Sequence, residues 1–128
     1  MRRALATLVL AALVPLGCGR ASERALEVRM RYSRFLPASL TVKEGTTVDF
    51  TLVNADPIDH EFIIGDRVVQ IAHELGTEAF HPPRPGEITI PAGETVSTTF
   101  TFGERDLLFG CHLPGHYVYG MRGTIDVV

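Results

Sequence analysis

Hydrophobic and polar residues alternate with a period of two over most of the chain from about residue 26 onward. The alternating runs are short and end at turns that contain glycine or proline, such as KEGT and PAGE. Because successive side chains of a strand point to opposite faces of a sheet, this pattern is typical of short, half-buried strands. It predicts an all-β sandwich or barrel. The predicted inward-facing residues are Leu26, Val28, Met30, Tyr32, Leu40, Val42, Val48, Phe50, Leu52, Ile88, Ile90, Val96, Phe100, Phe102, Leu107, Phe109, Cys111, Ile125 and Val127.

One internal segment interrupts the alternation. Residues 65–86 read GDRVVQIAHELGTEAFHPPRPG. The stretch VVQIAHELG fits one or two helical turns ended by Gly76, and HPPRPG predicts an extended loop, because proline cannot donate to a strand ladder. A connection of this length in a compact domain is usually functional or mobile. We therefore expect one long, partly helical loop at about residues 65–86.

The N-terminal residues have a third pattern. A short basic start, MRR, precedes the apolar run ALATLVLAALVPLG, which is too short for a membrane span and predicts an export signal at residues 1–17. The run ends in VPLGC, which resembles the lipobox of bacterial lipoproteins, although Pro15 stands where leucine is usual. Cys18 is then a candidate for lipidation, which would tether the protein to a membrane. Cleavage of an ordinary signal nearby is the alternative.

Composition limits the chain to one ordinary globular domain. The 128 residues are 45% hydrophobic and 21% charged, and the formal net charge of −3 provides no basic footprint for nucleic acid. We interpret residues 18–25 as a tether and residues 26–128 as the domain. If Cys18 is lipidated or removed, the domain keeps a single thiol, at Cys111, so it has no internal disulfide.

The stretch CHLPGHYVYGM, from Cys111 to Met121, is the strongest chemical signal in the sequence. The alternation places Cys111 on the core side at the end of a predicted strand. His116 and Met121 follow in a tight loop containing Pro114 and Gly115, which can return an imidazole and a thioether to the same point. Thiolate, imidazole and thioether are soft to borderline ligands, and together they favour copper over magnesium or calcium.

A trigonal copper site needs one more strong ligand, and His60 in NADPIDHEFII is the candidate. It lies at the start of a predicted strand, where the loops of a sandwich gather. Two histidines and one cysteine with a weak axial methionine are the ligands of blue-copper electron-transfer sites.

Residues 26–128 resemble the cupredoxins, or type 1 blue copper proteins. The resemblance rests on LTVKEGTTVDFTLVN, which is similar to their paired early strands, on DHEF, which is similar to their first-histidine motif, and on the CHLPGHYVYGM loop. Four residues separate Cys111 from His116 and four separate His116 from Met121, as in auracyanin- and rusticyanin-like members. The resemblance implies a Greek-key β-sandwich or barrel with one type 1 copper per chain. It also implies that His60, Cys111 and His116 are equatorial ligands and that Met121 is axial.

The sequence departs from the family at two places. Glu61 follows the first histidine, where many relatives have Asn or Ser, and neighbouring hydrogen bonds tune a copper site. The loop at residues 65–86 is also longer than in the smallest plastocyanins.

Three of the five histidines lie outside this ligand set. His112 follows Cys111 and should point to the opposite side of the strand, so we expect it not to bind the copper. Multicopper oxidases use a histidine at that place for a second centre, but they have another histidine before the cysteine, where this chain has Gly110. His73 and His81 are either surface histidines or part of a second, weaker metal site with Glu74 or Glu78.

These features together predict an exported mononuclear type 1 copper protein that carries single electrons and is not an enzyme. We expect it in the periplasm or on the outer face of the cytoplasmic membrane, attached to the membrane only through a lipid on Cys18. Redox partner proteins would dock near His116, where Leu113, Pro114 and Tyr117 provide an apolar surround. The alternative is a periplasmic copper carrier or copper-resistance protein on the same fold, which His73, His81 and His112 would favour.

Overall fold

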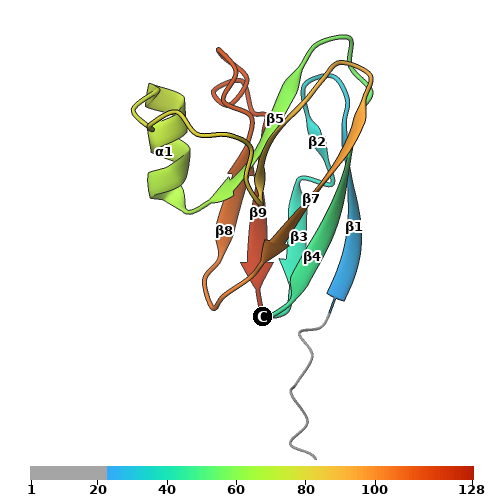
Figure 1. Cartoon of the computed structure of the whole chain (residues 1–128), viewed down its shortest axis with the longest axis vertical. Helices are drawn as coiled ribbons and strands as arrows, with labels where there is room; N and C mark the ends of the chain where they lie inside the picture. The colour runs from blue at the N-terminus through green and yellow to red at the C-terminus, as the bar shows by residue number, and fades with distance from the viewer. Residues whose placement is uncertain (1–22) are drawn as a thin grey trace, which may run out of the picture.

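Two β-sheets pack face to face in the computed structural model of the chain, which describes residues 23–128 (Figure 1). One sheet has the strand order β2-β1-β4-β7 and contains β1 (Glu23–Met30), β2 (Phe35–Leu36), β4 (Thr47–Asn54) and β7 (Thr95–Thr101). The other has the order β3-β9-β8-β5-β6 and contains β3 (Ser39–Val42), β5 (His60–Gly65), β6 (Glu87–Ile90), β8 (Leu107–Gly110) and β9 (Arg122–Val127). The pairs β1–β4 and β3–β9 are parallel, and the remaining pairs are antiparallel.

The expected all-β fold is confirmed as a sandwich rather than a closed barrel. The chain passes repeatedly between the two sheets, and its parallel pairs join strands that are not hairpin neighbours, as in Greek-key sandwiches. Strand β4 shows why the two sheets pack together, because its residues alternate between the core and solvent. Val48, Phe50 and Leu52 are fully buried, while Asp49 and Thr51 between them are exposed. The core is centred on ring contacts among five buried phenylalanines, Phe35, Phe50, Phe62, Phe102 and Phe109.

The segment at residues 65–86 contains the only helix in the described part of the chain, α1 (Arg67–Leu75). Asp66 begins it, because its Oδ1 accepts hydrogen bonds from the backbone N–H groups of Val68 and Val69. Gly76 ends it in the left-handed conformation, at φ 62°. The helix contacts β5 and β8 and lies beside the loop that follows β8 (Figure 1). The predicted helical turns ended by Gly76 are therefore confirmed.

Some details differ from the sequence-based expectation. Strand β1 begins at Glu23, so the last three residues of the expected tether belong to the sandwich. Tyr32 was predicted to face the core, but it lies in a turn after β1 with φ 54° and is 77% exposed. The expected signal at residues 1–17 and the candidate lipidation site Cys18 lie outside the described residues. Over residues 23–128, no helix is both long enough and apolar enough to cross a membrane.

Candidate metal centre

The predicted ligands meet at one end of the sandwich because two antiparallel strands of the same sheet bring them there. His60 is the first residue of β5, and Cys111 directly follows β8. Ile63 in β5 pairs with Gly110 in β8, so the start of one strand lies beside the end of the other. The connection from β8 to β9 then folds over this point, at the top of Figure 1.

The donor atoms of the three predicted equatorial ligands form a compact triangle. Cys111 Sγ lies 3.2 Å from His116 Nδ1 and 4.0 Å from His60 Nδ1, and the two imidazole nitrogens are 3.3 Å apart. Ligand atoms about 2.0–2.3 Å from a metal at the centre of a trigonal plane would lie roughly 3.5–3.8 Å apart. One thiol and two imidazole nitrogens at these separations fit a copper ion.

The orientation of His60 is set by Asp56. His60 is fully buried, and its Nε2 lies 2.8 Å from Asp56 Oδ2. Because a carboxylate can only accept, Nε2 carries the proton, and in a neutral ring Nδ1 presents its lone pair to the triangle. A carboxylate that holds the distal nitrogen of a metal-binding histidine also makes the imidazole a stronger donor.

Asp56 is itself held in the ionised form. Burial raises the pKa of its carboxyl group, but hydrogen bonds from the backbone N–H groups of Ser33 and Tyr32 and from His60 outweigh this effect, so the pKa lies below its ordinary value. Asn54 fixes the loop by accepting a hydrogen bond from the Asp56 N–H and donating to the Ile58 carbonyl. The His60 ring is therefore positioned before any metal binds.

Cys111 is fully buried at the end of β8, as the alternation predicted. Burial raises the pKa of its thiol, and hydrogen bonds from the backbone N–H groups of Glu61 and Leu113 partly oppose this effect. The Glu61 N–H lies 3.2 Å from Sγ. Glu61, a departure from the family pattern, thus contacts the sulfur through its backbone, and its side chain accepts the His112 N–H at 3.2 Å.

Backbone hydrogen bonds close the loop that carries His116 and Met121. The Met121 N–H donates to the His116 carbonyl at 2.9 Å, and the Cys111 N–H donates to the Met121 carbonyl at 3.1 Å. Met121 is fully buried, whereas His116 is partly exposed. Burial lowers the pKa of the His116 ring, and nearby His60 adds to this effect. His116 is thus the histidine of the triangle that reaches toward solvent.

His112 points away from the triangle, as expected for the residue after Cys111. Its Nε2 donates to Gln70 Oε1 at 2.8 Å, and its Nδ1 lies 2.9 Å from Glu74 Oε2. Its ring also stacks on Tyr117, with centroids 4.5 Å apart. His112 therefore attaches the ligand loop to helix α1.

His73 and His81 do come together, at a second cluster between α1 (Arg67–Leu75) and the start of β6 (Glu87–Ile90). They lie with Glu78 and Glu87, and the potential ligand atoms of all four are within 4.8 Å of one another. Glu74, the other carboxylate considered from the sequence, instead faces His112.

A comparison with known protein families agrees with a copper site of this geometry. The model of the copper-binding proteins of the plastocyanin/azurin family matches residues 23–128, which is every residue the structure describes. The chain belongs to this family. Copper is accordingly its cofactor, and the type 1 site comprises the group formed by His60, Cys111, His116 and Met121.

Two curated proteins with different names resemble the chain. It is 34% identical over 98 residues to the copper-resistant cuproprotein CopI of Rubrivivax gelatinosus, across 73% of this chain and 59% of that protein. It is 31% identical over 109 residues to auracyanin-B of Chloroflexus aurantiacus, across 73% of this chain and 46% of that protein. A crystal structure of auracyanin B superposes with a TM-score of 0.68 at 28% identity, covering 82% of this chain and 88% of the other. The chain thus spans about half to three fifths of the length of these two curated relatives.

Sequence reasoning missed three residues that shape these clusters: Asp56, Gln70 and Glu87. Asp56 lies four residues before His60, but Asp59 is nearer, and nothing in the sequence shows which one reaches the ring. Gln70 is a buried polar residue of α1 whose Nε2 donates to the Ile63 carbonyl at 3.0 Å. A glutamine within an apolar helical run is a weak signal that became meaningful only once the helix was placed.

Proposed function

We propose that the protein is an exported mononuclear type 1 copper protein that passes single electrons between redox partners and does not catalyse a reaction of its own. The observation that carries the proposal is that the metal-binding atoms are already positioned in the protein without a metal. The three donor atoms already form a triangle of suitable size, and Asp56 already fixes the His60 tautomer. A site that need not rearrange when the charge of the metal changes suits electron transfer.

Copper supplies the one-electron chemistry by cycling between its cuprous and cupric states, and the protein residues hold that site constant. Cys111 provides a thiolate that receives the Glu61 N–H, which limits the movement of the sulfur. Cys111 and Met121 are both fully buried, so water does not reach them. His116 is partly exposed and so offers a path for electrons from the centre to the surface.

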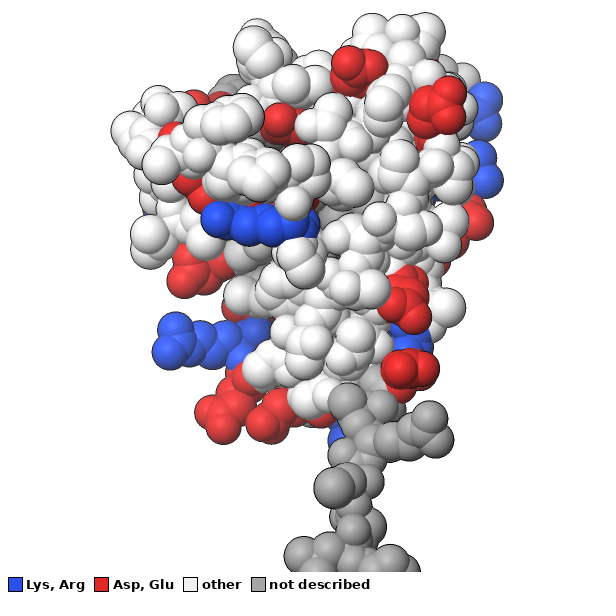
Figure 2. Space-filling view, in the orientation of Figure 1, with Lys and Arg blue, Asp and Glu red and all other residues white. Residues whose placement is uncertain are grey.

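The surface around His116 supports docking of a redox partner at this end of the molecule. Pro114 is exposed, and Val118 and Tyr119 are 66% and 78% exposed. Tyr117, expected in the same surround, is instead half-buried against His112. Acidic and basic side chains are interspersed over the face shown in Figure 2. An apolar rim among mixed charges suits a small, short-lived interface.

A second role, in copper resistance, is favoured by one observation. The relative with 34% identity is named a copper-resistant cuproprotein, and a cuproprotein of that kind could use the same copper centre. Under this proposal the protein would limit copper toxicity outside the cytoplasm.

The location is part of the proposal. The apolar N-terminal run and the Gly–Cys pair that ends it support export to the periplasm or to the outer face of the cytoplasmic membrane, with lipidation at Cys18. Metabolic labelling with a fatty-acid analogue would test the anchor. Label on the wild type and none on Cys18→Ala is expected, and equal labelling of both would contradict it.

Electron transfer and copper resistance can be separated by one pair of experiments. Protein-film voltammetry of the copper-loaded protein should give a reversible one-electron wave, and a copper chelator should remove the metal slowly.

The second experiment tests a strain lacking the gene for growth on copper, with rescue by the wild type or by Cys111→Ser. Normal copper tolerance of that strain, with a reversible wave in vitro, would support the electron carrier alone. Copper sensitivity rescued only by the wild type would support resistance.

A further inference from the structure

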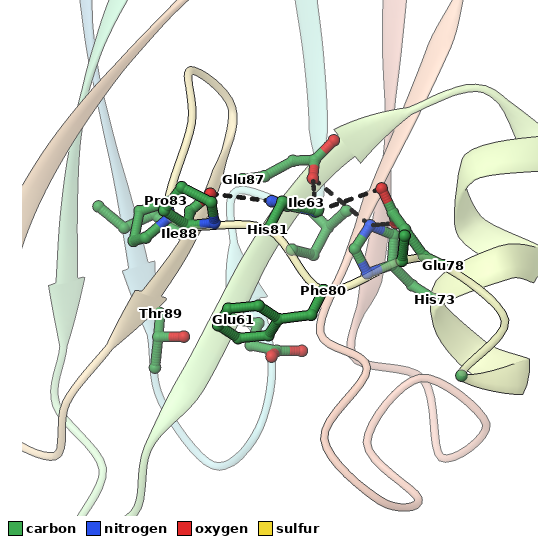
Figure 3. Close-up of a pocket in the computed structure, with 13 residues that line it drawn as sticks. Glu61, Ile63, His73, Glu78, Phe80, His81, Pro83, Glu87, Ile88 and Thr89 are labelled. Atoms are coloured by element: carbon green, nitrogen blue, oxygen red, sulfur yellow. Dashed lines mark hydrogen bonds and ion pairs between the residues drawn. The ribbon is translucent and has the colours of Figure 1, made fainter.

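A second group of metal-binding side chains lies between helix α1 and strand β6, apart from the copper triangle. His73 comes from α1, Glu78 and His81 from the segment after it, and Glu87 from the start of β6. Figure 3 shows the four side chains converging from these three elements. His73 Nε2 contacts Glu78 Oε2 and lies 3.5 Å from Glu87 Oε2, and His81 Nε2 lies 3.1 Å from the same Glu87 oxygen.

The converging atoms are buried and lack hydrogen bonds. His73 Nε2, Glu78 Oε2 and Glu87 Oε2 are all inaccessible to solvent, and none of the three makes a hydrogen bond. The Glu87 side chain is only 9% exposed. A buried carboxylate oxygen without a hydrogen-bond donor lowers the stability of the fold by roughly several kcal/mol, unless a cation balances its charge. Three such atoms aimed at one point indicate that a cation belongs there.

The tautomer of His81 supports a metal at that point. Its Nδ1 lies 2.9 Å from the Pro82 carbonyl, which can only accept, so Nδ1 carries the proton. In a neutral ring, Nε2 then points its lone pair at Glu78 Oε1 and Glu87 Oε2, 3.2 and 3.1 Å away. A lone pair facing two carboxylate oxygens is repulsive unless a cation lies between them. Metal-binding histidines commonly donate their other N–H to a backbone carbonyl in this way.

Arg84 orients the two carboxylates. Its Nη2 donates to Glu78 Oε1 at 2.5 Å and to Glu87 Oε1 at 2.8 Å. The Oε2 atoms of both glutamates are thereby turned toward the histidines. With neutral imidazoles, the two carboxylates and Arg84 carry a net charge of about −1, so a divalent cation is electrostatically favourable.

We propose that His73, Glu78, His81 and Glu87 bind a divalent first-row transition-metal ion. Two imidazoles and two carboxylates are borderline to hard donors, which disfavours cuprous copper, and calcium and magnesium prefer oxygen ligands alone. Four protein ligands suit tetrahedral zinc. By the general affinity order of these metals, cupric copper would bind more tightly than zinc.

The two sites lie close enough that an experiment must distinguish their metals. The His73 ring stacks on His112, with centroids 5.6 Å apart, and His112 directly follows the copper ligand Cys111. Filling the type 1 site with copper first keeps zinc out of it. Zinc is then the probe for the second site, because it is colourless and leaves the type 1 absorption readable.

The test is zinc binding to the purified protein that has first been loaded with one equivalent of copper, so that copper fills the type 1 site and leaves the second site free. After addition of zinc and gel filtration, elemental analysis should find one copper and one zinc per wild-type chain. Zinc should also raise the melting temperature in a concentration-dependent way. His81→Asn and Glu87→Gln should lose the zinc and the thermal shift while keeping the copper and its colour. Glu104→Gln, an exposed carboxylate at the other end of the sandwich, is the matched control and should keep both metals.

The proposal fails if the copper-loaded wild type retains no zinc and shows no thermal shift, in which case the cluster is held by protonated imidazole–carboxylate ion pairs. It also fails if both variants retain zinc as the wild type does. If His81→Asn or Glu87→Gln lacks the type 1 colour and so has not folded, Glu78→Gln replaces it, because the Glu78 side chain is 22% exposed and that of Glu87 only 9%. Loss of zinc in Glu78→Gln would support the site, and retention would overturn it.

Discussion

The Nε2–H group of His60 donates to Asp56 Oδ2 at 2.8 Å, and this contact presents the opposite nitrogen to the copper triangle. Asp56→Asn keeps a similar shape but removes the negative charge. We expect copper affinity to fall by about 10–100-fold, because such carboxylates orient the imidazole and strengthen it as a donor. Competition with a chelator measures this loss. Asp59→Asn is the control, since Asp59 is exposed in the same loop and accepts a hydrogen bond from the Ala92 N–H rather than from His60. Equal affinity in Asp56→Asn and Asp59→Asn would contradict the role of Asp56.

The low pKa of Asp56 should make the stability of the metal-free protein depend on pH. Its folded-state pKa lies below the ordinary value of about 3.9, so its contribution is complete above that pH and is lost as pH falls through the folded pKa. Urea unfolding of the apoprotein should therefore show the wild type more stable than Asp56→Asn at neutral pH. The difference should shrink below about pH 4. A difference that stays constant down to pH 2 would mean that Asp56 does not titrate as described.

Gly110 lies where a side chain would collide with the support of the copper loop. A Cβ at this position would be 2.5 Å from the Tyr117 ring and 2.9 Å from Gln70 Oε1. Gly110→Ala should lower the free energy of unfolding by about 1–3 kcal/mol, as overpacking usually does. Gly103→Ala is the matched control, because a Cβ there meets nothing within 4 Å. Denaturant melts of the two apoproteins test this, and equal midpoints would show that the loop absorbs the extra atom.

Met121 should tune the reduction potential without being required for binding. Met121→Leu removes the thioether and should raise the potential, because cupric copper loses a donor. Met121→Gln offers a harder oxygen and should lower it. Voltammetry measures both shifts. Met30→Leu, a change at a methionine that is also fully buried but lies in β1, should leave the potential unchanged. If the Met121 variants behave like Met30→Leu, Met121 is a packing residue.

The fold and the main ligands were predictable because both leave periodic or local signals. The period-two alternation fixed which residues of β4 face inward, and the spacing of Cys111, His116 and Met121 lies within one loop. His60 could be proposed because it begins a strand. The prediction for Tyr32 was wrong because the alternation continues past Met30 into a turn, where the chain leaves the sheet.

The supporting residues could not be predicted because their roles arise from tertiary contacts. Glu87 reaches His81 only because β6 pairs with β5 and returns the segment after α1 to the sheet. Asp56 and Asp59 have the same chemistry in sequence, and only the folded loop points one of them at His60. Gln70 meets His112 because α1 packs beside β8.

The visible spectrum of the purified protein with one equivalent of cupric copper tests the central claim most directly. A buried thiolate bound to cupric copper in a trigonal site should give an intense blue or green charge-transfer band. Cys111→Ser should lose this band and most of its copper affinity. A wild-type protein that binds one copper tightly and stays colourless, or a Cys111→Ser variant that keeps the colour, would contradict the account.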